Sequence, residues 1–398
     1  MEGNYDSVIV GASPFCMTEA YCRAMSGQRV ALIERKDHIG GAWATIDSEF
    51  FDDVEYGTHL LFPPDPSVYE FVRDYLGWEL ESMHPPPEVV ATGRRFRYSP
   101  RELLRADILA SWDAFRRGYG VKEADTPTRG WWASWYDRRF RPVRNCLRYG
   151  LKYLKHADVQ HEYLYPTGGT PVMLSSFRRQ LAEADVDVRL GTALKSINVR
   201  KNAQRVSLLT DAGKLTARRL VLTTCSSTPD FRIDGEPLEL PREQQYVNHL
   251  HLYVSGCEQR RFSYILFNKH PFLRRVSDVT RFARSRQPAK ADRRALCVWV
   301  RGRSKLPHDE HGVQQIMKEL VHLEYLPDAA TVDGFHWSKY GGTHRENETL
   351  ARIRSATSPL VQVVSSGNLV LSMRSELDRW QRLLQQAPTL TNRDRMAA

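Results

Sequence analysis

The chain has 398 residues, a length that fits two or three lobes sharing a core better than one ordinary domain. Hydrophobic residues make up 41% and charged residues 26%, the composition of a folded globular protein. No run approaches the roughly 18 uninterrupted apolar residues of a membrane span, and no secretory signal is visible at the N-terminus. The cysteines form neither a CxxC pair nor a metal-binding spacing, so we expect reduced thiols, no metal site and a cytoplasmic protein.

The net charge of +10 is concentrated in two stretches. Residues 260–305 contain many arginines and lysines with few acids, and residues 138–155 interleave basic residues with aromatic ones. Such stretches suit phosphate-bearing partners, from a nucleotide diphosphate to the backbone of a nucleic acid. The alternative is an ordinary solvated surface in an Arg-rich chain. We therefore expect an anionic small molecule or nucleotide as substrate, nucleic acid as a further partner through these two stretches, and no membrane partner.

The N-terminal residues have the pattern of a βαβ unit. An apolar run at residues 7–10 ends at Gly11, and a helical stretch follows through Met25. A second apolar run over residues 30–33 ends in Glu34. Apolar run, glycine turn, helix and second apolar run together predict two parallel strands joined by a helix.

The first turn of this unit stands where a dinucleotide-binding fold has its GxGxxG fingerprint. Gly11 permits the tight turn, and the helix that begins near Pro14 presents its first amides to a pyrophosphate. Ser13 and Cys16 occupy the positions of the second and third glycines. Glu34, at the end of the second strand, is placed to accept hydrogen bonds from ribose hydroxyls.

Further along the chain, residues 65–155 are predicted to be helical. After a helix over 170–184, three strands are expected, at residues 186–190, 205–210 and 219–224. Alternation of apolar and polar residues over 244–300 predicts an antiparallel sheet. A last strand at 368–371 and a closing helix over 375–386 complete the prediction.

The segment Glu34-Arg-Lys-Asp-His-Ile-Gly-Gly-Ala-Trp43 follows the predicted second strand. Its glycine pair lets the chain pass close to a cofactor. The segment resembles the second FAD signature of the superfamily that includes the flavin amine oxidases, protoporphyrinogen oxidase and UDP-galactopyranose mutase. Together with the first turn, this resemblance implies FAD as the cofactor and the following contacts to it: Gly11, Ala12, Ser13, Pro14, Glu34, Arg35, Gly40, Gly41, Ala42 and Trp43.

The resemblance continues in order along the chain. Tyr56-Gly-Thr-His-Leu60 resembles the mutase segment with a histidine beside the flavin ring, and Leu190–Leu194 stands where a strand passes the adenine. Gly367–Arg374 resembles the final strand, whose arginine reaches the FAD pyrophosphate before the last helix. These matches add five implied FAD contacts: Thr58, His59, Leu194, Arg374 and Leu377.

The resemblance also implies catalytic and substrate-binding residues. Arg274, after Pro271, stands where the mutases have a substrate-diphosphate arginine, and Tyr340 resembles their substrate-phosphate tyrosine. A free histidine has a pKa near neutrality, so His59 is a candidate general acid or base. We expect Arg275 to point to the opposite face of its strand from Arg274, because successive side chains of a strand alternate.

The predicted fold class is α/β, with a Rossmann-like FAD-binding domain, an inserted helical domain and an antiparallel β-sheet substrate domain. The FAD-binding domain is expected to be discontinuous, over residues 1–64, 166–235 and 341–398. The helical domain is expected over 65–165 and the substrate domain over 236–340.

Four functions follow from these expectations. The first is a flavoenzyme resembling UDP-galactopyranose mutase, an oxidoreductase or isomerase that uses flavin N5 or hydride chemistry on a phosphate-bearing, nucleotide-type substrate. The second is an FAD-dependent enzyme that modifies a nucleotide or base within nucleic acid, as in phage DNA hypermodification. The third is an FAD amine oxidase, and the fourth is a non-catalytic flavin-binding module. The fold alone does not choose among them.

Overall fold

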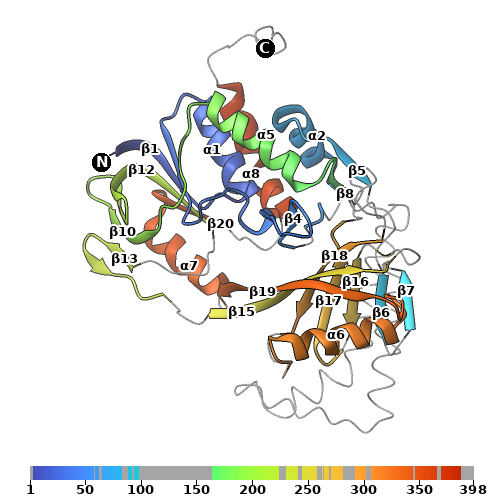
Figure 1. The fold of residues 1–398 in the computed structure, drawn as a ribbon. Helices are drawn as coiled ribbons and strands as arrows, with labels where there is room; N and C mark the ends of the chain where they lie inside the picture. The colour runs from blue at the N-terminus through green and yellow to red at the C-terminus, as the bar shows by residue number, and fades with distance from the viewer. Residues whose placement is uncertain are drawn as a thin grey trace, which may run out of the picture. The chain divides into compact units, whose positions relative to one another are not determined.

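The computed structural model of the protein describes residues 3–57, 59–61, 65–82, 88–91, 94–97, 164–223, 230–240, 244–257, 262, 264–268, 270–280, 292–301, 306–343, 346–364 and 369–386. The chain divides into two compact units (Figure 1). Unit 1 comprises Met1–Ser82, Leu164–Val247 and Lys339–Ala398, and unit 2 comprises Met83–Tyr163 and Asn248–Ser338. The mixed α/β architecture predicted from the sequence is confirmed.

Unit 1 contains a nine-stranded sheet in the part of the chain that the structure describes. Its parallel part runs β9 (Asp187–Arg189), β2 (Val30–Ile33), β1 (Gly3–Val10), β12 (Gly213–Thr223) and β20 (Val361–Val364). The first half of β12 also pairs with an antiparallel extension that contains β11 (Arg205–Thr210) and β10 (Leu194–Arg200). Beyond β10 the sheet ends in β13 (Asp230–Ile233), which pairs with β10 in parallel, and in β14 (Glu236–Pro237), which pairs with β13 antiparallel. All four residues of β2 are buried, as expected for a parallel strand covered on both faces.

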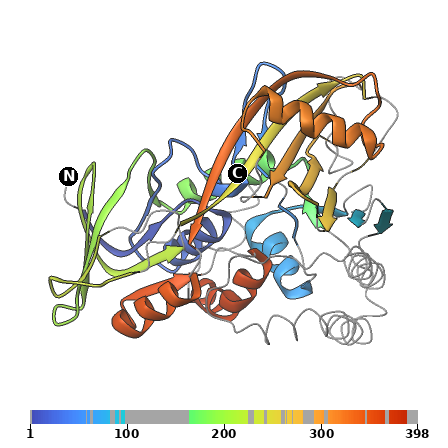
Figure 2. The ribbon, with the colours of Figure 1, turned by 90° about the horizontal axis from the view of Figure 1, so that it is seen from below.

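Helices and further strands cover the two faces of this sheet (Figures 1 and 2). Ile9, Leu32 and Val221 share one hydrophobic core with residues of four helices: α1 (Pro14–Met25), α2 (Pro66–Leu76), α5 (Thr170–Glu183) and α8 (Leu369–Gln385). Val8 and Ile33 point the other way, because neighbours in a strand alternate, into a second core with α7 (Glu346–Thr357) and the β10–β11 strands. The predicted βαβ unit is confirmed as β1–α1–β2.

The C-terminal prediction was wrong in its placement of the last strand. Residues 369–371 begin helix α8, and the last strand is β20, seven residues or so earlier in the chain. The side chains of Val370, Met373, Leu377 and Trp380 are buried at helical spacing, so the apolar residues interpreted as a strand form the first turn of an amphipathic helix. Arg374 therefore lies in a helix and not in a strand.

The range expected to form a helical domain, residues 65–165, contains helix and strand in its described part. Helix α2 is followed by β5 (Leu80–Ser82), β6 (Glu88–Ala91) and β7 (Arg94–Arg97), and β8 (Leu164–Pro166) pairs with β5. The two valines of β6 are β-branched and favour a strand over a helix. Residues 98–163 lie outside the described part of the chain.

Unit 2 is built on a seven-stranded sheet with the order β19-β15-β18-β17-β16-β6-β7, as far as the described residues extend. The strands not yet bounded are β15 (Gln244–Ser255), β16 (Tyr264–Asn268), β17 (Leu273–Asp278), β18 (Arg294–Val300) and β19 (Thr331–Thr343). The antiparallel pairing of β15, β18, β17 and β16 confirms the sheet predicted over residues 244–300.

Helix α6 (Glu310–His322) covers one face of this sheet (Figures 1 and 2). Its residues Ile316 and Leu320 pack against strand residues such as Leu250 and Val298 in an apolar core. The helix starts at Asp309, whose carboxylate accepts a hydrogen bond from the Gly312 amide and satisfies one of the first-turn amides. Among the described residues, no helix has the length and apolarity needed to cross a membrane.

Candidate functional site

Two glycine turns of unit 1, far apart in the βαβ sequence pattern, are joined by backbone hydrogen bonds. The Gly40 amide donates to the Ala12 carbonyl at 2.7 Å, and the Gly11 amide donates to the Ile33 carbonyl at 2.8 Å. Gly11 and Gly40 have φ angles of 99° and 112°, which only glycine adopts readily. A Cβ on Gly41 would lie 3.5 Å from Ser13. The two signatures found in the sequence therefore form one surface.

Ser13 ends this turn and begins helix α1. Its hydroxyl oxygen accepts a hydrogen bond from the Cys16 amide at 3.4 Å, and Pro14 occupies the first helical position, where no amide hydrogen is needed. Cys16, in the position of the third glycine, is fully buried with its Sγ 3.7 Å from the Val10 carbonyl oxygen. Burial raises the pKa of the Cys16 thiol to about 11. The thiol thus packs under the turn as a neutral group.

Glu34, at the end of β2, is held beside the same turn. Its carboxylate accepts hydrogen bonds from the Ala12 amide at 2.9 Å and from the Lys36 amide at 3.0 Å. The Lys36 ammonium lies over the Tyr56 ring at 4.7 Å from its centroid, and Arg35 is exposed. The acid is therefore positioned at the carboxyl end of the parallel strands, where α/β sheets bind ligands.

His59 stacks on Trp43 next to the second glycine turn. The two rings are 4.8 Å apart between centroids and inclined by 22°. The His59 Nε2 lies 2.6 Å from the Ala42 carbonyl oxygen in the short 3-10 helix Gly41–Trp43. A carbonyl oxygen only accepts, so Nε2 carries the hydrogen and, in the neutral ring, Nδ1 carries the lone pair. The contact joins His59 to the residues predicted to bind FAD.

The other predicted cofactor contacts are more scattered. Leu194, half-buried, begins β10 and packs at the margin of the second core of unit 1. Leu377 is fully buried in the core that also contains Ala12 and Trp43. Arg374 lies in α8 with its guanidinium 3.6 Å from Asp65 and 3.9 Å from Asp378. Thr58 and the side chain of Tyr340, a residue of β19, lie outside the described residues.

In unit 2, the sheet face opposite α6 carries polar and aromatic side chains. His249 of β15 pairs with Trp299 of β18, which in turn pairs with Arg275 of β17. Two residues further along β15, on the same face of the sheet, His251 pairs with Cys297 of β18. Burial, together with the charge of His336, lowers the pKa of His251 to about 4.

The expectation that Arg274 and Arg275 point to opposite faces was wrong. A β-bulge between Leu273 and Arg275 shifts the register against β18, so Arg274 is an extra residue in its strand. Both guanidinium groups consequently reach Trp299, at 4.2 Å from the ring centroid for Arg274 and 5.0 Å for Arg275. Sequence reasoning missed Arg275 and Trp299 as partners of Arg274, because a bulge is determined by the neighbouring strand.

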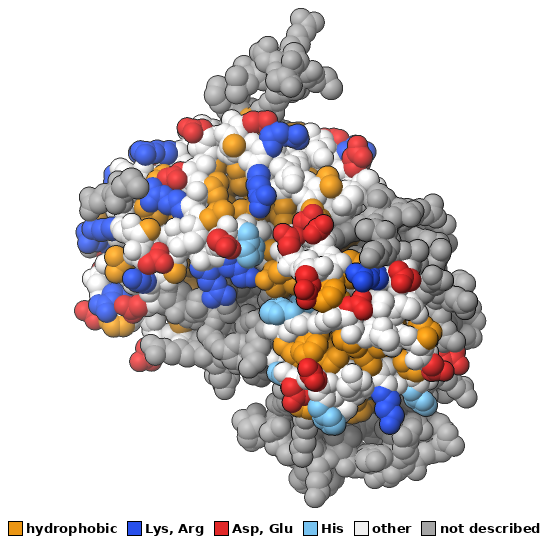
Figure 3. Space-filling model, in the orientation of Figure 1, with side chains coloured by type: hydrophobic (Ala, Val, Ile, Leu, Met, Phe, Trp, Pro, Cys, Tyr) orange, Lys and Arg blue, Asp and Glu red, His pale blue; other side chains and the backbone are white. Residues whose placement is uncertain are grey.

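The basic stretches predicted to bind nucleic acid are described only in part. Residues 138–155 lie outside the described chain, as do all of residues 281–291. Within 260–305, Arg293 lies 3.6 Å from Asp333, and the buried Arg294 lies 3.6 Å from Asp278. On the face of the described residues drawn in Figure 3, acidic and basic side chains are interspersed.

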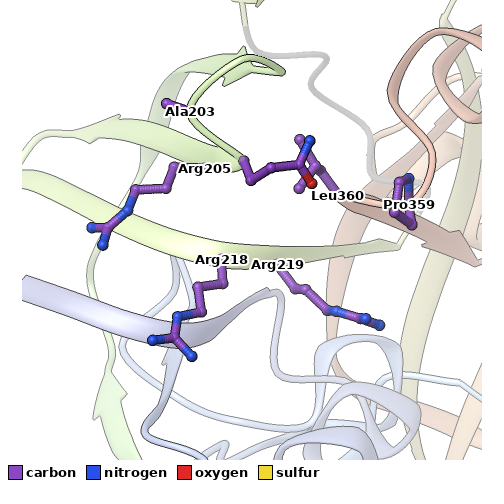
Figure 4. Close-up of a pocket in the computed structure, with 7 residues that line it drawn as sticks. Ala203, Arg205, Arg218, Arg219, Pro359 and Leu360 are labelled. Carbon is purple, nitrogen blue, oxygen red and sulfur yellow. The ribbon is translucent and has the colours of Figure 1, made fainter.

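A pocket of about 350 Å³ in unit 1 is lined by Ala203, Gln204, Arg205, Arg218, Arg219, Pro359 and Leu360. In Figure 4 the side chains of Arg205 and Arg218 point the same way and Arg219 points away from them. Arg218 lies 3.3 Å from Asp6, and Arg219 pairs in register with Ser7 in the middle of β1. The pocket is thus separate from the Gly11 turn at the end of that strand. Among the described residues, no group of three or more His, Cys, Asp or Glu side chains has a metal-binding arrangement.

Comparison with known proteins adds a match over the region that contains both glycine turns. Residues 9–75 match the model of the NAD(P)-binding Rossmann-like domain. Reduced UDP-galactopyranose mutase has a similar structure, with a TM-score of 0.67 and 14% identity over 96% of this chain and 94% of that one. Wild-type putrescine oxidase bound to putrescine is similar over 100% of both chains, with a TM-score of 0.61 and 16% identity.

Cyclohexylamine oxidase from Brevibacterium oxydans IH-35A is also similar, with a TM-score of 0.61 and 14% identity over 96% of this chain and 99% of that one. These likenesses extend over both units, although few residues are identical. The chain therefore contains a Rossmann-like dinucleotide-binding domain and has the fold shared by the flavin amine oxidases and UDP-galactopyranose mutase.

Proposed function

We propose that the protein is an FAD-dependent enzyme, an oxidoreductase or isomerase, that acts on a phosphate-bearing, nucleotide-type substrate. The observation that carries the proposal is the junction of the two glycine turns at the start of α1, with Glu34 beside them. The fold shared with UDP-galactopyranose mutase and with amine oxidases supports it.

The residues of this junction suit FAD. The first amides of α1 and the Ser13 region suit a pyrophosphate, which a helix N-terminus attracts. The Glu34 carboxylate suits the ribose hydroxyls. The absence of side chains at Gly11 and Gly41 keeps the surface open for close approach of a ligand to the backbone. When bound, FAD supplies either a nucleophilic N5 or a hydride acceptor.

His59 is the residue that moves or holds a proton in this proposal. Its Nε2 hydrogen is directed to the Ala42 carbonyl, and the stack on Trp43 fixes the ring plane. In the neutral ring, Nδ1 then carries a lone pair that can accept a proton. Because Ala42 and Trp43 follow the Gly40–Gly41 turn directly, the histidine is positioned by the same segment that is proposed to contact the cofactor.

The substrate proposal rests on unit 2. Arg274 is exposed on β17 and Arg275 lies beside it, both over Trp299. Burial and the charge of Arg274 lower the pKa of Arg301, so three cationic side chains share this region. An amine substrate is cationic at neutral pH and would be repelled, whereas a phosphate would be attracted. This charge favours the phosphate-bearing substrate over the amine oxidase alternative.

A cytoplasmic location belongs to the same proposal. In the described residues, Cys16, Cys22, Cys257 and Cys297 are all buried free thiols. Free thiols are typical of a reducing compartment.

The test is the absorbance spectrum of the purified protein and the mass of the cofactor that it releases. We expect an oxidised flavin spectrum and release of FAD by heat or acid, because no residue lies in an evident flavinylation motif. His59→Phe, which keeps the stack on Trp43, should keep FAD and lose catalytic turnover by about 10² to 10⁴. A protein that stays colourless after reconstitution with FAD would contradict the proposal.

A further inference from the structure

The twin-arginine site, defined as Arg274, Arg275 and Trp299, owes its geometry to the β-bulge in β17. Leu273 pairs with Val300 and Arg275 pairs with Trp299, two adjacent residues of β18. Strand β17 therefore has one extra residue, Arg274, between these two pairs. A regular strand would put the two arginines on opposite faces. The bulge instead brings both guanidinium groups to one indole ring.

Arg275 is the more unusual member of the site. The residue is 9% exposed, and its Nε has no hydrogen-bond partner among the described residues. Its guanidinium also lies 5.6 Å from the Tyr264 ring centroid. In the described ranges, neither Arg274 nor Arg275 forms an ion pair with a carboxylate. Aromatic faces offset only part of the free energy needed to bury an unpaired charge.

The charge and the donor geometry of the site indicate which class of ligand it would bind. A guanidinium group is always charged and donates through a planar fork, which fits two oxygens of a phosphate. Arg301 adds positive charge nearby, and its own hydrogen bonds go to the carbonyl oxygens of Leu273 and Phe267. A single carboxylate would leave part of this charge without a partner, whereas a diphosphate carries enough oxygens for both arginines.

We propose that Arg275 binds the substrate together with Arg274, and that the twin-arginine site takes the phosphate or diphosphate group of that substrate. This inference rests on the proposed function, which it deepens by naming a second anion-binding residue. Arg275 is thereby a specificity-determining residue, since a bound oxyanion would give its Nε the acceptor that no described residue supplies.

Calorimetric titration of the FAD-containing protein with inorganic pyrophosphate at low salt tests the inference. We expect saturable binding to the wild type, weakened about 10- to 100-fold in Arg275→Gln and in Arg274→Gln. Arg232→Gln removes an exposed arginine that is paired with Asp230 and should leave binding unchanged. Equal affinity of wild type and Arg275→Gln, or no binding to a wild type that contains FAD, would overturn the inference.

A second variant, Arg275→Lys, tests the inference even if Arg275→Gln does not fold. Arg275→Lys keeps the charge and loses the planar fork, so we expect it to fold and to bind pyrophosphate several-fold more weakly than the wild type. Unchanged affinity in this variant also contradicts the inference. FAD content measured on the same samples separates the two proposals, because a wild type that cannot hold FAD contradicts the proposed function itself.

Discussion

Glu19 of α1 and Arg379 of α8 form a bidentate ion pair at the edge of the core of unit 1, although they lie 360 positions apart in the chain. The two Arg379 Nη atoms lie 3.0 and 2.5 Å from the Glu19 carboxylate oxygens. Arg23 Nε and Trp380 Nε1 also donate to this carboxylate, and Glu19 is completely buried. Burial alone raises the pKa of Glu19, but the charges of Arg23 and Arg379 outweigh it and the pKa is lowered. The pair fixes α8 against the helix that begins at the first glycine turn.

Replacing Glu19 by Gln should destabilise the protein strongly. The change leaves the buried Arg23 without its counterion and removes the bidentate partner of Arg379, and breaking a buried ion pair costs about 3 to 5 kcal/mol in comparable cases. The free energy of unfolding in urea measures the effect. Glu376→Gln is the matched control, because Glu376 also binds Arg379, at 2.8 Å, but near the surface. It should cost less than about 1 kcal/mol, and equal losses in the two variants would contradict the prediction.

Gly40→Ala should abolish FAD binding, whereas Gly27→Ala should not. Both glycines have positive φ angles, 112° and 85°, so both variants share the backbone strain. A Cβ on Gly40 would lie 2.9 Å from backbone atoms of Ala44, but a Cβ on Gly27 would meet nothing within 4 Å. Only the first change displaces the second glycine turn. FAD content per chain after reconstitution is the measurement, and equal FAD content in the two variants would refute the explanation.

Stability should fall as the pH drops below about 6.5, the ordinary histidine pKa. The folded-state pKa of His251 is lowered to about 4. Between that pH and the ordinary histidine pKa, the unfolded chain binds a proton at this histidine and the folded chain does not. The contribution of neutral His251 is therefore complete above the unfolded-state pKa and is lost as the pH falls toward 4. At about 1.4 kcal/mol per pKa unit, the loss is on the order of 3 kcal/mol.

Urea unfolding at about pH 7.5 and pH 5 measures the larger part of this loss, in a range above the titration of most carboxyl groups. His251→Gln, which does not titrate, should show a smaller pH dependence than the wild type. His311→Gln removes an exposed histidine of α6 and should leave the pH dependence unchanged. The same slope in all three proteins would show that His251 is not the group responsible.

The thiols of Cys16 and Cys22 should resist alkylation in the folded protein at about pH 8, because the thiolate is the reactive form. Burial raises the pKa of Cys16 to about 11 and raises that of Cys22 as well. Mass spectrometry after iodoacetamide treatment, with and without denaturant, is the measurement. Rapid labelling of Cys16 in the native protein would contradict its place beneath the first glycine turn.

Much of unit 1 was predictable from the sequence, because its signals are local. The apolar run before Gly11, the helix after Ser13 and the acid at Glu34 each depend on residues close in the chain, and the structure contains β1, α1 and β2 as predicted. The antiparallel sheet of unit 2 was predictable for the same reason, since alternation is visible within each strand. The cofactor contacts of Arg374 and Leu377, and the role of Tyr340, stay predictions.

The sequence by itself therefore determined the element types, the βαβ unit and the two glycine turns. Only the tertiary structure decided which turns meet, through Gly40 and Ala12, and which arginine of α8 pairs with Glu19. It also decided that residues 369–371 extend a helix, and that a bulge brings Arg275 to Trp299. These features depend on pairing and packing between segments that are distant in the chain, and local propensity carries no information about such partners.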